Sequence, residues 1–250
     1  MAKQIQSIER GLFILESIMF NKEPVTATEL ARRLGVHKST VSHLTATLIE
    51  QGYLARVPGS SKLTIGPKIY RASRSVGISG EKLIALPPLL ERLASETGET
   101  AHVAELRGRY VIYVVNRFPQ KALRVQTEAG AVESAHSTAV GKALLSGLGD
   151  EEVTELFAGV QMEKFTKKTI ASVEGLLVEL AEVRRKGFAM DLGEQTPGTG
   201  CVAAPVRDAA GMTVAAVGIS GPEQRLFDEG TVPADAVLDC ARKIEEVLRS

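Results

Sequence analysis

Small hydrogen-bonding side chains gather between residues 26 and 48, in a pattern that suits contact with a nucleic acid. Apolar residues recur there at intervals of three and four, which predicts two short helices that each bury one face. These apolar residues are Leu30, Leu34, Val41, Leu44 and Leu48. The polar residues that fall largely off this face in the second helix are Lys38, Ser39, Thr40, Ser42, His43, Thr45 and Thr47. Short donors and acceptors on an exposed helix are what the major groove of DNA accepts, so base-edge recognition is the first chemistry to consider.

The ends of the two helices carry residues that commonly begin and end helices. Thr26 and Glu29 have the spacing of a capping box, in which two side chains bind backbone N–H groups at a helix start. Gly35 suits the left-handed residue that ends the first helix. The stretch is therefore interpreted as a helix-turn-helix. A bare helical hairpin packed on a core would show the same apolar spacing, so the neighbouring segments must decide.

The flanking segments complete a winged helix-turn-helix over residues 1–66. Upstream, apolar residues with helical spacing predict a helix that supplies the third face of a small core: Ile5, Ile8, Leu12, Leu15 and Met19. Downstream, residues 52–57 and 62–66 are typical of two strands around a turn at 58–61. Three helices followed by a hairpin is the order of elements in a winged helix-turn-helix.

Charge is divided unevenly along the chain. Residues 1–74 contain eleven Lys and Arg against five Glu, a net charge of +6. The whole chain has 30 basic and 30 acidic residues, so residues 75–250 carry a net charge of −6. Nucleic-acid affinity needs local rather than total positive charge, because it comes from neutralising phosphates. The basic head and the winged-helix pattern together predict a DNA-binding domain.

The DNA-contacting residues are predicted from position and side-chain type. The expected base-facing residues on the second helix are Lys38, Ser39, Thr40, Ser42, His43 and Thr47. The expected phosphate-binding residues are Arg32 on the first helix and Arg56 and Lys62 on the hairpin.

The composition of the whole chain excludes several classes of protein. With 44% apolar and 24% charged residues, the 250-residue chain has the composition of a globular protein with a core. No apolar run approaches the roughly 18 residues of a membrane helix, and the first residues lack the pattern of a signal peptide. Cys201 and Cys240 offer no disulfide framework. We therefore expect a cytoplasmic protein with no membrane partner.

The remainder of the chain is predicted to form a linker helix over residues 67–80 and a second domain over 81–250. Pro67 suits the first turn of the linker helix, and Pro87-Pro88 predicts a kink or a late start in the helix that follows. Strands are expected at Thr100–Leu106, Tyr110–Asn116, Ala122–Thr127, Phe188–Leu192, Cys201–Arg207 and Met212–Ser220. Helices are expected at about 138–148, 150–158, 172–186 and 233–248. This order indicates an α+β fold with an antiparallel sheet backed by helices, which often holds a small ligand.

Four features of the second domain could contact such a ligand. His136 and Ser137 precede a small-residue helix whose first N–H groups could receive an anion, or they only cap it. Asp191 could bind a ligand hydroxyl or cap the turn at Gly193. Cys201 follows two glycines, and its residue type favours a small buried side chain over a nucleophile. Ser220 faces a cavity or ends a strand.

Catalytic and metal-binding motifs do not appear in the sequence. There is no Gly-x-Ser-x-Gly elbow, and no His or Cys pair has the spacing of metal ligands. We therefore expect no catalytic residue, no metal and no cofactor. The rival hypothesis is a small-molecule enzyme whose basic head only mediates self-association.

The chain resembles the IclR (isocitrate lyase regulator) family of bacterial transcription factors, collinearly from about Ser7 to Pro222. In the first domain the resemblance rests on residues 7–16, on 38–41 and on 51–54. In the second domain it rests on residues 96–100, 136–144, 182–187, 200–208 and 219–221. This sequence has Ser137 where the family commonly has Cys, and His43 where the family often has Arg.

The resemblance implies a winged helix-turn-helix joined by a linker helix to a GAF-like effector domain. It also implies a homodimer or homotetramer that binds palindromic DNA operators, with repression or activation set by a small acidic or aromatic metabolite. The residues it implies for the effector pocket are Val125, Ala139, Val140, Asp191, Cys201 and Ser220.

Overall fold

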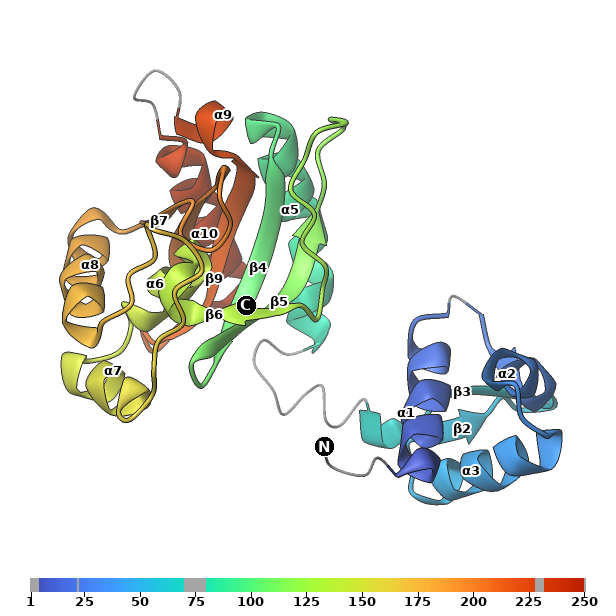
Figure 1. Cartoon of the computed structure of the whole chain (residues 1–250). Helices are drawn as coiled ribbons and strands as arrows, with labels where there is room; N and C mark the ends of the chain where they lie inside the picture. The colour runs from blue at the N-terminus through green and yellow to red at the C-terminus, as the bar shows by residue number, and fades with distance from the viewer. Residues whose placement is uncertain (1–4, 22, 70–79, 228–231, 250) are drawn as a thin grey trace. The chain divides into compact units, whose positions relative to one another are not determined.

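The computed structural model describes residues 5–21, 23–69, 80–227 and 232–249, which fall into two compact units (Figure 1). The first unit is residues 1–76 and the second is residues 77–250. Most of the predicted linker helix, residues 70–79, lies outside the described residues; residues 67–69 are helical.

The first unit is a three-helix domain with a small antiparallel sheet. Its helices are α1 (Gln6–Met19), α2 (Ala27–Leu34) and α3 (Lys38–Glu50). Its strands β1 (Val25–Thr26), β2 (Leu54–Arg56) and β3 (Lys62–Ile65) lie in the order β1-β3-β2. Leu54 pairs with Ile65 and Arg56 with Leu63, so β2 and β3 form the predicted hairpin, called the wing below. The predicted winged helix-turn-helix is confirmed.

The start and end of α2 confirm the predicted capping signals. The Glu29 backbone N–H donates to Thr26 Oγ1 at 3.2 Å, and the Thr26 backbone N–H donates to Glu29 Oε2 at 2.8 Å. Gly35 ends α2 with φ of +65°, in the left-handed region that favours glycine. The chain therefore changes direction between α2 and α3.

The prediction for α1 identified a real apolar stripe but assigned it wrongly to the core. Ile14 and Ile18, one helical turn apart, are buried against α2, α3 and the sheet. Four residues of the predicted stripe are exposed instead: Ile5, Ile8, Leu12 and Met19. At 3.6 residues per turn, these four lie on a different side of α1 from Ile14 and Ile18. Helix α1 therefore has a second apolar side with no partner among the described residues.

The second unit is built on a six-stranded antiparallel sheet with the order β6-β5-β4-β9-β8-β7. The strands are β4 (Thr100–Arg107), β5 (Tyr110–Arg117), β6 (Val132–Ser134), β7 (Ala189–Leu192), β8 (Thr199–Arg207) and β9 (Thr213–Pro222). The helical elements are α5 (Gly80–Thr97), η1 (Ala135–Ser137), α6 (Ala139–Leu145), α7 (Asp150–Phe157), α8 (Val173–Lys186), α9 (Glu223–Phe227) and α10 (Ala234–Arg249). The predicted α+β class is confirmed.

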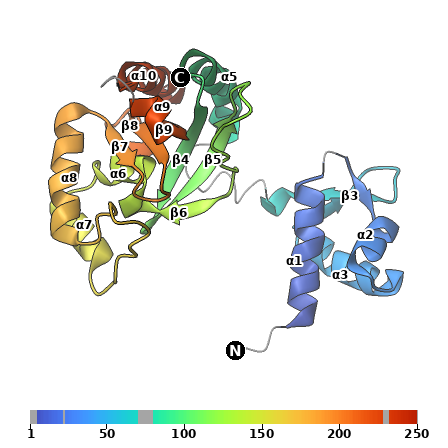
Figure 2. The same ribbon diagram turned by 45° about the horizontal axis from the view of Figure 1, so that its top comes forward.

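Helices cover both faces of this sheet (Figure 2). On one face, α5 and α10 bury Leu90, Val237 and Ile244 against the sheet residues Val103 and Val217 and their neighbours. On the other face, α6 packs on Ala104, Ala203 and Ala216, α8 packs on α6, and α7 packs on α8. The small side chains of the central strands let α6 approach the sheet closely.

Two predictions about the second unit are wrong. Ala122–Thr127 is not a strand: its neighbours contact it through isolated bonds, such as Thr100 Oγ1 donating to the Val125 carbonyl oxygen at 2.6 Å. Strand β6 takes the place beside β5. Helix α5 also does not start late at Pro87-Pro88, since it runs from Gly80 to Thr97 with both prolines inside it. The buried leucines of α5 on both sides of the prolines offset the lost backbone bonds.

Gly141 in α6 is expected to be essential for packing. A Cβ atom at this position would overlap the backbone of Ala135 in η1. Gly141→Ala is therefore expected to lower the free energy of unfolding of the second unit by about 2 kcal/mol or more, as measured by urea denaturation. Gly11→Ala in α1 is the control, because no atom lies within 4 Å of its added Cβ. It should raise stability slightly through helix propensity. Equal effects from both substitutions would contradict this account of the α6–η1 contact.

Candidate DNA-binding surface and effector cavity

Helix α3 presents most of the predicted polar residues to solvent. Lys38, Ser39, Ser42, His43 and Thr47 are exposed, and Thr40 is half-buried. The prediction was wrong for one other residue, Thr45, which is buried. Its position, four residues after Val41, continues the buried face of the helix.

Two threonine hydroxyls on α3 are engaged within the helix. Thr45 Oγ1 donates to the Ser42 carbonyl oxygen at 3.1 Å, which satisfies the buried hydroxyl. Thr47 Oγ1 donates to the His43 carbonyl oxygen at 3.2 Å. The bond leaves the lone pairs of Thr47 available but occupies its proton, so Thr47 can act on a ligand only as an acceptor while the bond persists.

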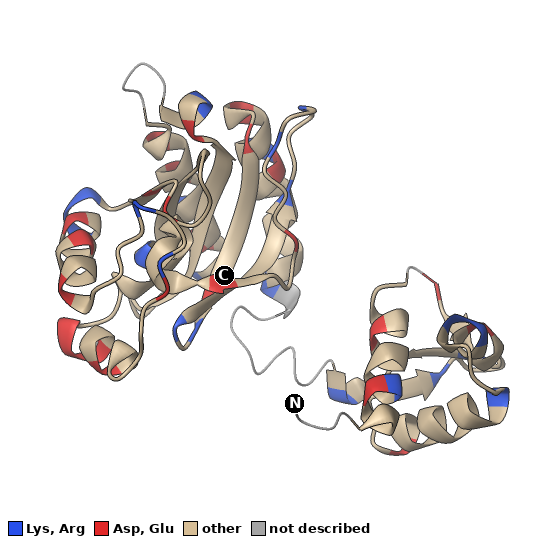
Figure 3. Cartoon of the chain, in the orientation of Figure 1, with Lys and Arg blue, Asp and Glu red and all other residues tan. Residues whose placement is uncertain are grey.

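Basic side chains on α2 and the wing flank α3. Arg32, Arg56 and Lys62 are exposed. None of the ion pairs among the described residues involves these three side chains. Figure 3 shows basic residues on α2 and at the start of α3, whereas acidic residues gather on α7 and α8 of the second unit. These cations are available for an external anion.

The second unit contains a cavity of about 250 Å³ between the sheet and the segments that cross it. Four of the six residues predicted for the effector pocket line it: Val125, Asp191, Cys201 and Ser220. The other two, Ala139 and Val140, do not belong to this lining; they are fully buried in the core beneath α6. The prediction missed the other lining residues: Tyr113, Gln126, Thr127, Glu133, Thr138, Gln195, Thr196 and Thr199.

Thr138, not Ser137, caps α6. The Gly141 backbone N–H donates to Thr138 Oγ1 at 3.2 Å, which occupies one of the N–H groups that could have received an anion. Ser137 Oγ instead donates to the Gln195 side chain. His136 Nε2 lies 2.9 Å from the carbonyl oxygen of Glu163, and its ring stacks on Phe165. His136 and Ser137 therefore have separate structural partners and form no catalytic pair.

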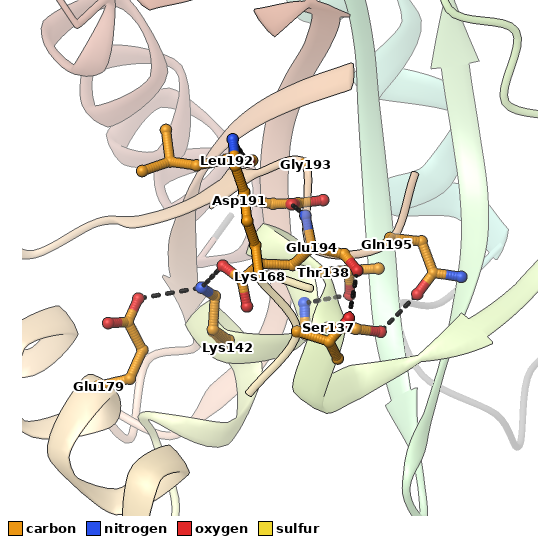
Figure 4. Close-up of polar contacts among 12 residues, drawn as sticks. Ser137, Thr138, Lys142, Lys168, Glu179, Asp191, Leu192, Gly193, Glu194 and Gln195 are labelled. Carbon is orange, nitrogen blue, oxygen red and sulfur yellow. Dashed lines mark hydrogen bonds and ion pairs between the residues drawn. The ribbon is translucent and has the colours of Figure 1, made fainter. Parts of the chain in front are cut away.

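Asp191 caps the turn that follows β7, which is one of the two roles predicted for it. Its Oδ1 accepts a hydrogen bond from the Glu194 backbone N–H at 2.5 Å, across Gly193 with φ of +82° (Figure 4). Burial raises the pKa of Asp191 from its ordinary value of 3.8 to about 7, and this effect outweighs the lowering by the Glu194 N–H. The same carboxyl lines the cavity, so both predicted roles remain open to it.

A buried lysine fixes the position of this turn against the helices. Lys142 Nζ on α6 lies 2.6 Å from Glu194 Oε1 and 3.0 Å from Glu179 Oε1 on α8 (Figure 4). Its side chain is 1% exposed. Burial raises the pKa of Glu194, and Lys142 opposes that rise. Two carboxylates compensate the buried ammonium, and the three groups tie α6, α8 and the turn at 193–195 together.

Cys201 and His102 do not form a reactive pair, although Cys201 Sγ lies 3.8 Å from His102 Nε2. Burial raises the pKa of the Cys201 thiol to about 12 and lowers the pKa of His102 to about 4. Both groups are therefore neutral near pH 7, and the thiolate that nucleophilic chemistry needs is absent. Cys201 behaves as the small buried residue favoured from its type.

The described residues contain no group of three or more His, Cys, Asp or Glu side chains that could hold a metal ion. Within the same residues, no helix combines the length and the apolar character needed to cross a membrane.

Asp191→Asn is expected to flatten the pH dependence of stability of the second unit between pH 4 and 7. The pKa of Asp191 is higher in the folded chain, about 7, than its ordinary 3.8, so folding favours the protonated form. The stability that Asp191 contributes is full below about pH 4 and is lost as pH rises to 7. Each pKa unit corresponds to about 1.4 kcal/mol, so the wild type should lose a few kcal/mol more than Asp191→Asn over this range. Urea denaturation at a series of pH values measures both slopes, and identical slopes would contradict the raised pKa.

Comparison with known proteins covers almost the whole chain. The IclR helix-turn-helix domain matches residues 7–58, and the domain described as "Bacterial transcriptional regulator IclR C-terminal" matches residues 82–246. The HTH-type transcriptional regulator BhcR of Paracoccus denitrificans is 31% identical over 241 residues, which cover 96% of this chain and 86% of that protein. The transcriptional repressor IclR of Escherichia coli is 31% identical over 242 residues, covering 96% of this chain and 88% of the repressor.

Solved structures agree with this assignment. The crystal structure of the Thermotoga maritima IclR superposes with a TM-score of 0.71 at 25% identity, covering 99% of this chain and 100% of that one. The relatives are named as regulators of transcription, which sets aside the rival hypothesis of a small-molecule enzyme. The chain belongs to the IclR family of bacterial transcriptional regulators.

Proposed function

We propose that this regulator binds a palindromic operator in double-stranded DNA through α3 and the wing, and that a small metabolite in the cavity changes its affinity for that operator. The observation that carries the proposal is the exposed polar face of α3, flanked by cations that have no ion-pair partner among the described residues. The same chain carries a polar cavity in its second unit. A cytoplasmic location follows from action on DNA.

The DNA contacts are assigned by the exposure and chemistry of the side chains. Base edges in the major groove would be contacted by Lys38, Ser39, Thr40, Ser42, His43 and Thr47, of which the half-buried Thr40 has the least reach. Phosphates would be bound by the exposed Arg32 of α2 and by the exposed Arg56 and Lys62 of the wing.

The effector assignment rests on the cavity and on a structural neighbour. Val125, Asp191, Cys201 and Ser220 line the same cavity, as a shared ligand would require. Ala139 and Val140 would act only from behind the lining, by holding α6 in place. An IclR homolog from Microbacterium hydrocarbonoxydans, 21% identical with a TM-score of 0.68, was crystallised with 4-hydroxybenzoate. That complex supports a small-molecule ligand for a chain of this fold, and the family resemblance predicts an acidic or aromatic one.

Regulation requires that the ligand favour one arrangement of paired DNA-binding units over another. A ligand can shift operator affinity only through a difference in its own affinity for the two arrangements, and such coupling typically amounts to about 1–3 kcal/mol. A palindromic operator presents two equal half-sites, so the paired units would come from two copies of the chain.

The exposed apolar side of α1 supports self-association as a homodimer, or as a homotetramer built from dimers. Ile5, Ile8, Leu12 and Met19 are between 43% and 60% exposed and follow one side of the helix. A contiguous exposed apolar stripe of this kind marks an interaction surface. A second copy of α1 would cover it with a matching stripe, since a two-fold interface pairs the same surface on both subunits.

Lys62→Ala is expected to weaken DNA binding by a similar factor for every sequence, because a phosphate contact carries no base information. The plot of log affinity against log salt concentration should become shallower by about one unit. Gel-shift titrations at several salt concentrations measure this slope. Lys164→Ala, an exposed lysine of the second unit, is the control and should leave the slope unchanged. A loss confined to particular sequences would contradict the phosphate assignment.

Leu12→Glu is expected to disrupt self-association, because it places a charge in the apolar stripe of α1 that a second copy would cover. Sedimentation equilibrium should show the average mass falling toward that of a single chain. Val178→Glu on α8, where the native side chain is 70% exposed, is the control and should leave the mass unchanged. A monomeric wild type, or a Leu12→Glu protein that associates as the wild type does, would contradict the α1 interface.

A further inference from the structure

We propose that the cavity takes an uncharged, hydroxyl-rich molecule such as an alditol or a sugar, whose hydroxyls donate to Glu133 and Asp191 on the two edge strands of the sheet. The inference rests on the proposed function, since it names the class of ligand for the same cavity. It departs from the acidic or aromatic class that the family resemblance predicts, because the ligand it names is uncharged and aliphatic.

The charges that line the cavity are all acidic. Glu133 and Asp191 are the carboxyl-bearing members of the lining, and no lysine or arginine is among the described residues that line it. Lys142 lies nearby, but its ammonium is bound to Glu194 and Glu179 and its side chain is 1% exposed. A ligand carboxylate entering this space would lose its hydration and meet two carboxyl groups without a basic partner, which disfavours an anion.

The rest of the lining consists mainly of neutral groups that both donate and accept hydrogen bonds. Hydroxyl groups come from Tyr113, Thr127, Thr138, Thr196, Thr199 and Ser220, and amides from Gln126 and Gln195. The hydroxyls of Thr127, Thr196 and Thr199 are not engaged by another described side chain or backbone group. Val125 is the aliphatic member of the lining. An aromatic ring would leave these three free hydroxyls unpaired, whereas a chain of hydroxyls can pair with them.

The two carboxyl groups reach the cavity from opposite edges of the sheet. Glu133 is on β6 and Asp191 is on β7, the first and last strands in the order β6-β5-β4-β9-β8-β7. Tyr113 Oη donates to Glu133 Oε2 at 2.7 Å, which orients that carboxyl. Glu133 Oε1 has no hydrogen-bond partner among the described residues and can accept from a ligand. Two carboxyl acceptors from separate strands match a ligand that carries more than one hydroxyl.

A cavity of about 250 Å³ suits a compact metabolite rather than a drug-sized molecule, whose sites begin at roughly 300 Å³. A cationic amine would also satisfy Glu133 and Asp191. An ammonium group only donates hydrogen bonds, so it would leave the protons of the hydroxyl and amide groups without an acceptor. A hydroxyl-rich molecule supplies both donors and acceptors, so the lining favours it.

Isothermal titration of the full-length protein with matched probes tests the ligand class. The probes are alditols and aldoses of four to six carbons, the aldonate of each carbon skeleton, 4-hydroxybenzoate and putrescine. At least one alditol or aldose should bind, with a Kd at least about tenfold lower than that of the aldonate with the same skeleton. Tighter binding by an aldonate, 4-hydroxybenzoate or putrescine, or no binding by any alditol or aldose, would overturn the proposal.

Glu133→Gln tests the specific contact. The amide retains the size of the side chain but loses its charge, so affinity for the uncharged probe that binds should fall by about tenfold or more. Glu151→Gln on α7, far from the lining, is the control and should leave the affinity unchanged. Thermal unfolding of both variants establishes that each is folded. Unchanged affinity in folded Glu133→Gln would overturn the role of Glu133.

The ligand class and the proposed function can fail separately. Gel shifts with genomic DNA measure operator binding without any ligand. If an anionic or aromatic probe both binds and changes operator affinity, the proposed function stands and the hydroxyl-rich ligand class is wrong.

Discussion

Arg32, Arg56 and Lys62 of the first unit form no ion pair with any described carboxylate, and the proposed DNA binding depends on this. Every ion pair among the described residues lies in the second unit. In the proposed complex, Arg32, Arg56 and Lys62 would meet a phosphate without first breaking an internal ion pair. Helix α3 has Lys38 and Glu50 at its ends and no Lys, Arg, Asp or Glu between them, so in the proposed complex the flanking cations would supply attraction and the helix would supply selectivity.

In the second unit, by contrast, the buried cation Lys142 is fully paired with carboxylates. Lys142 is buried with two carboxylates, and its position on α6 joins α8 to the turn that carries Asp191 and Gln195. An ammonium removed from water is tolerated only with such compensation. The compensation leaves no net positive charge for the cavity, and this explains why a unit with a buried lysine beside its cavity still has an acidic lining. One arrangement thus sets both the shape and the polarity of the candidate effector site.

Local signals in the sequence predicted the first unit well, because its elements are short and their ends are marked by Thr26, Glu29 and Gly35. They failed for α1, where two apolar sides compete and only tertiary packing decides that Ile14 and Ile18 face the core. They failed again at residues 122–127, whose alternating pattern does not reveal that β6 takes the edge position. Four residues of the predicted pocket meet around the cavity. Tyr113 and Glu133 were missed because nothing in the sequence shows that the two edges of the sheet converge on one space.

Salt-dependent binding of the full-length protein to fragments of its own genome tests the central claim most directly. The account predicts that a small set of double-stranded fragments is enriched, and that their affinity falls steeply with salt at a slope of about −0.9 per neutralised phosphate. An absence of any preferred fragment, or an affinity that does not change with salt, would contradict it.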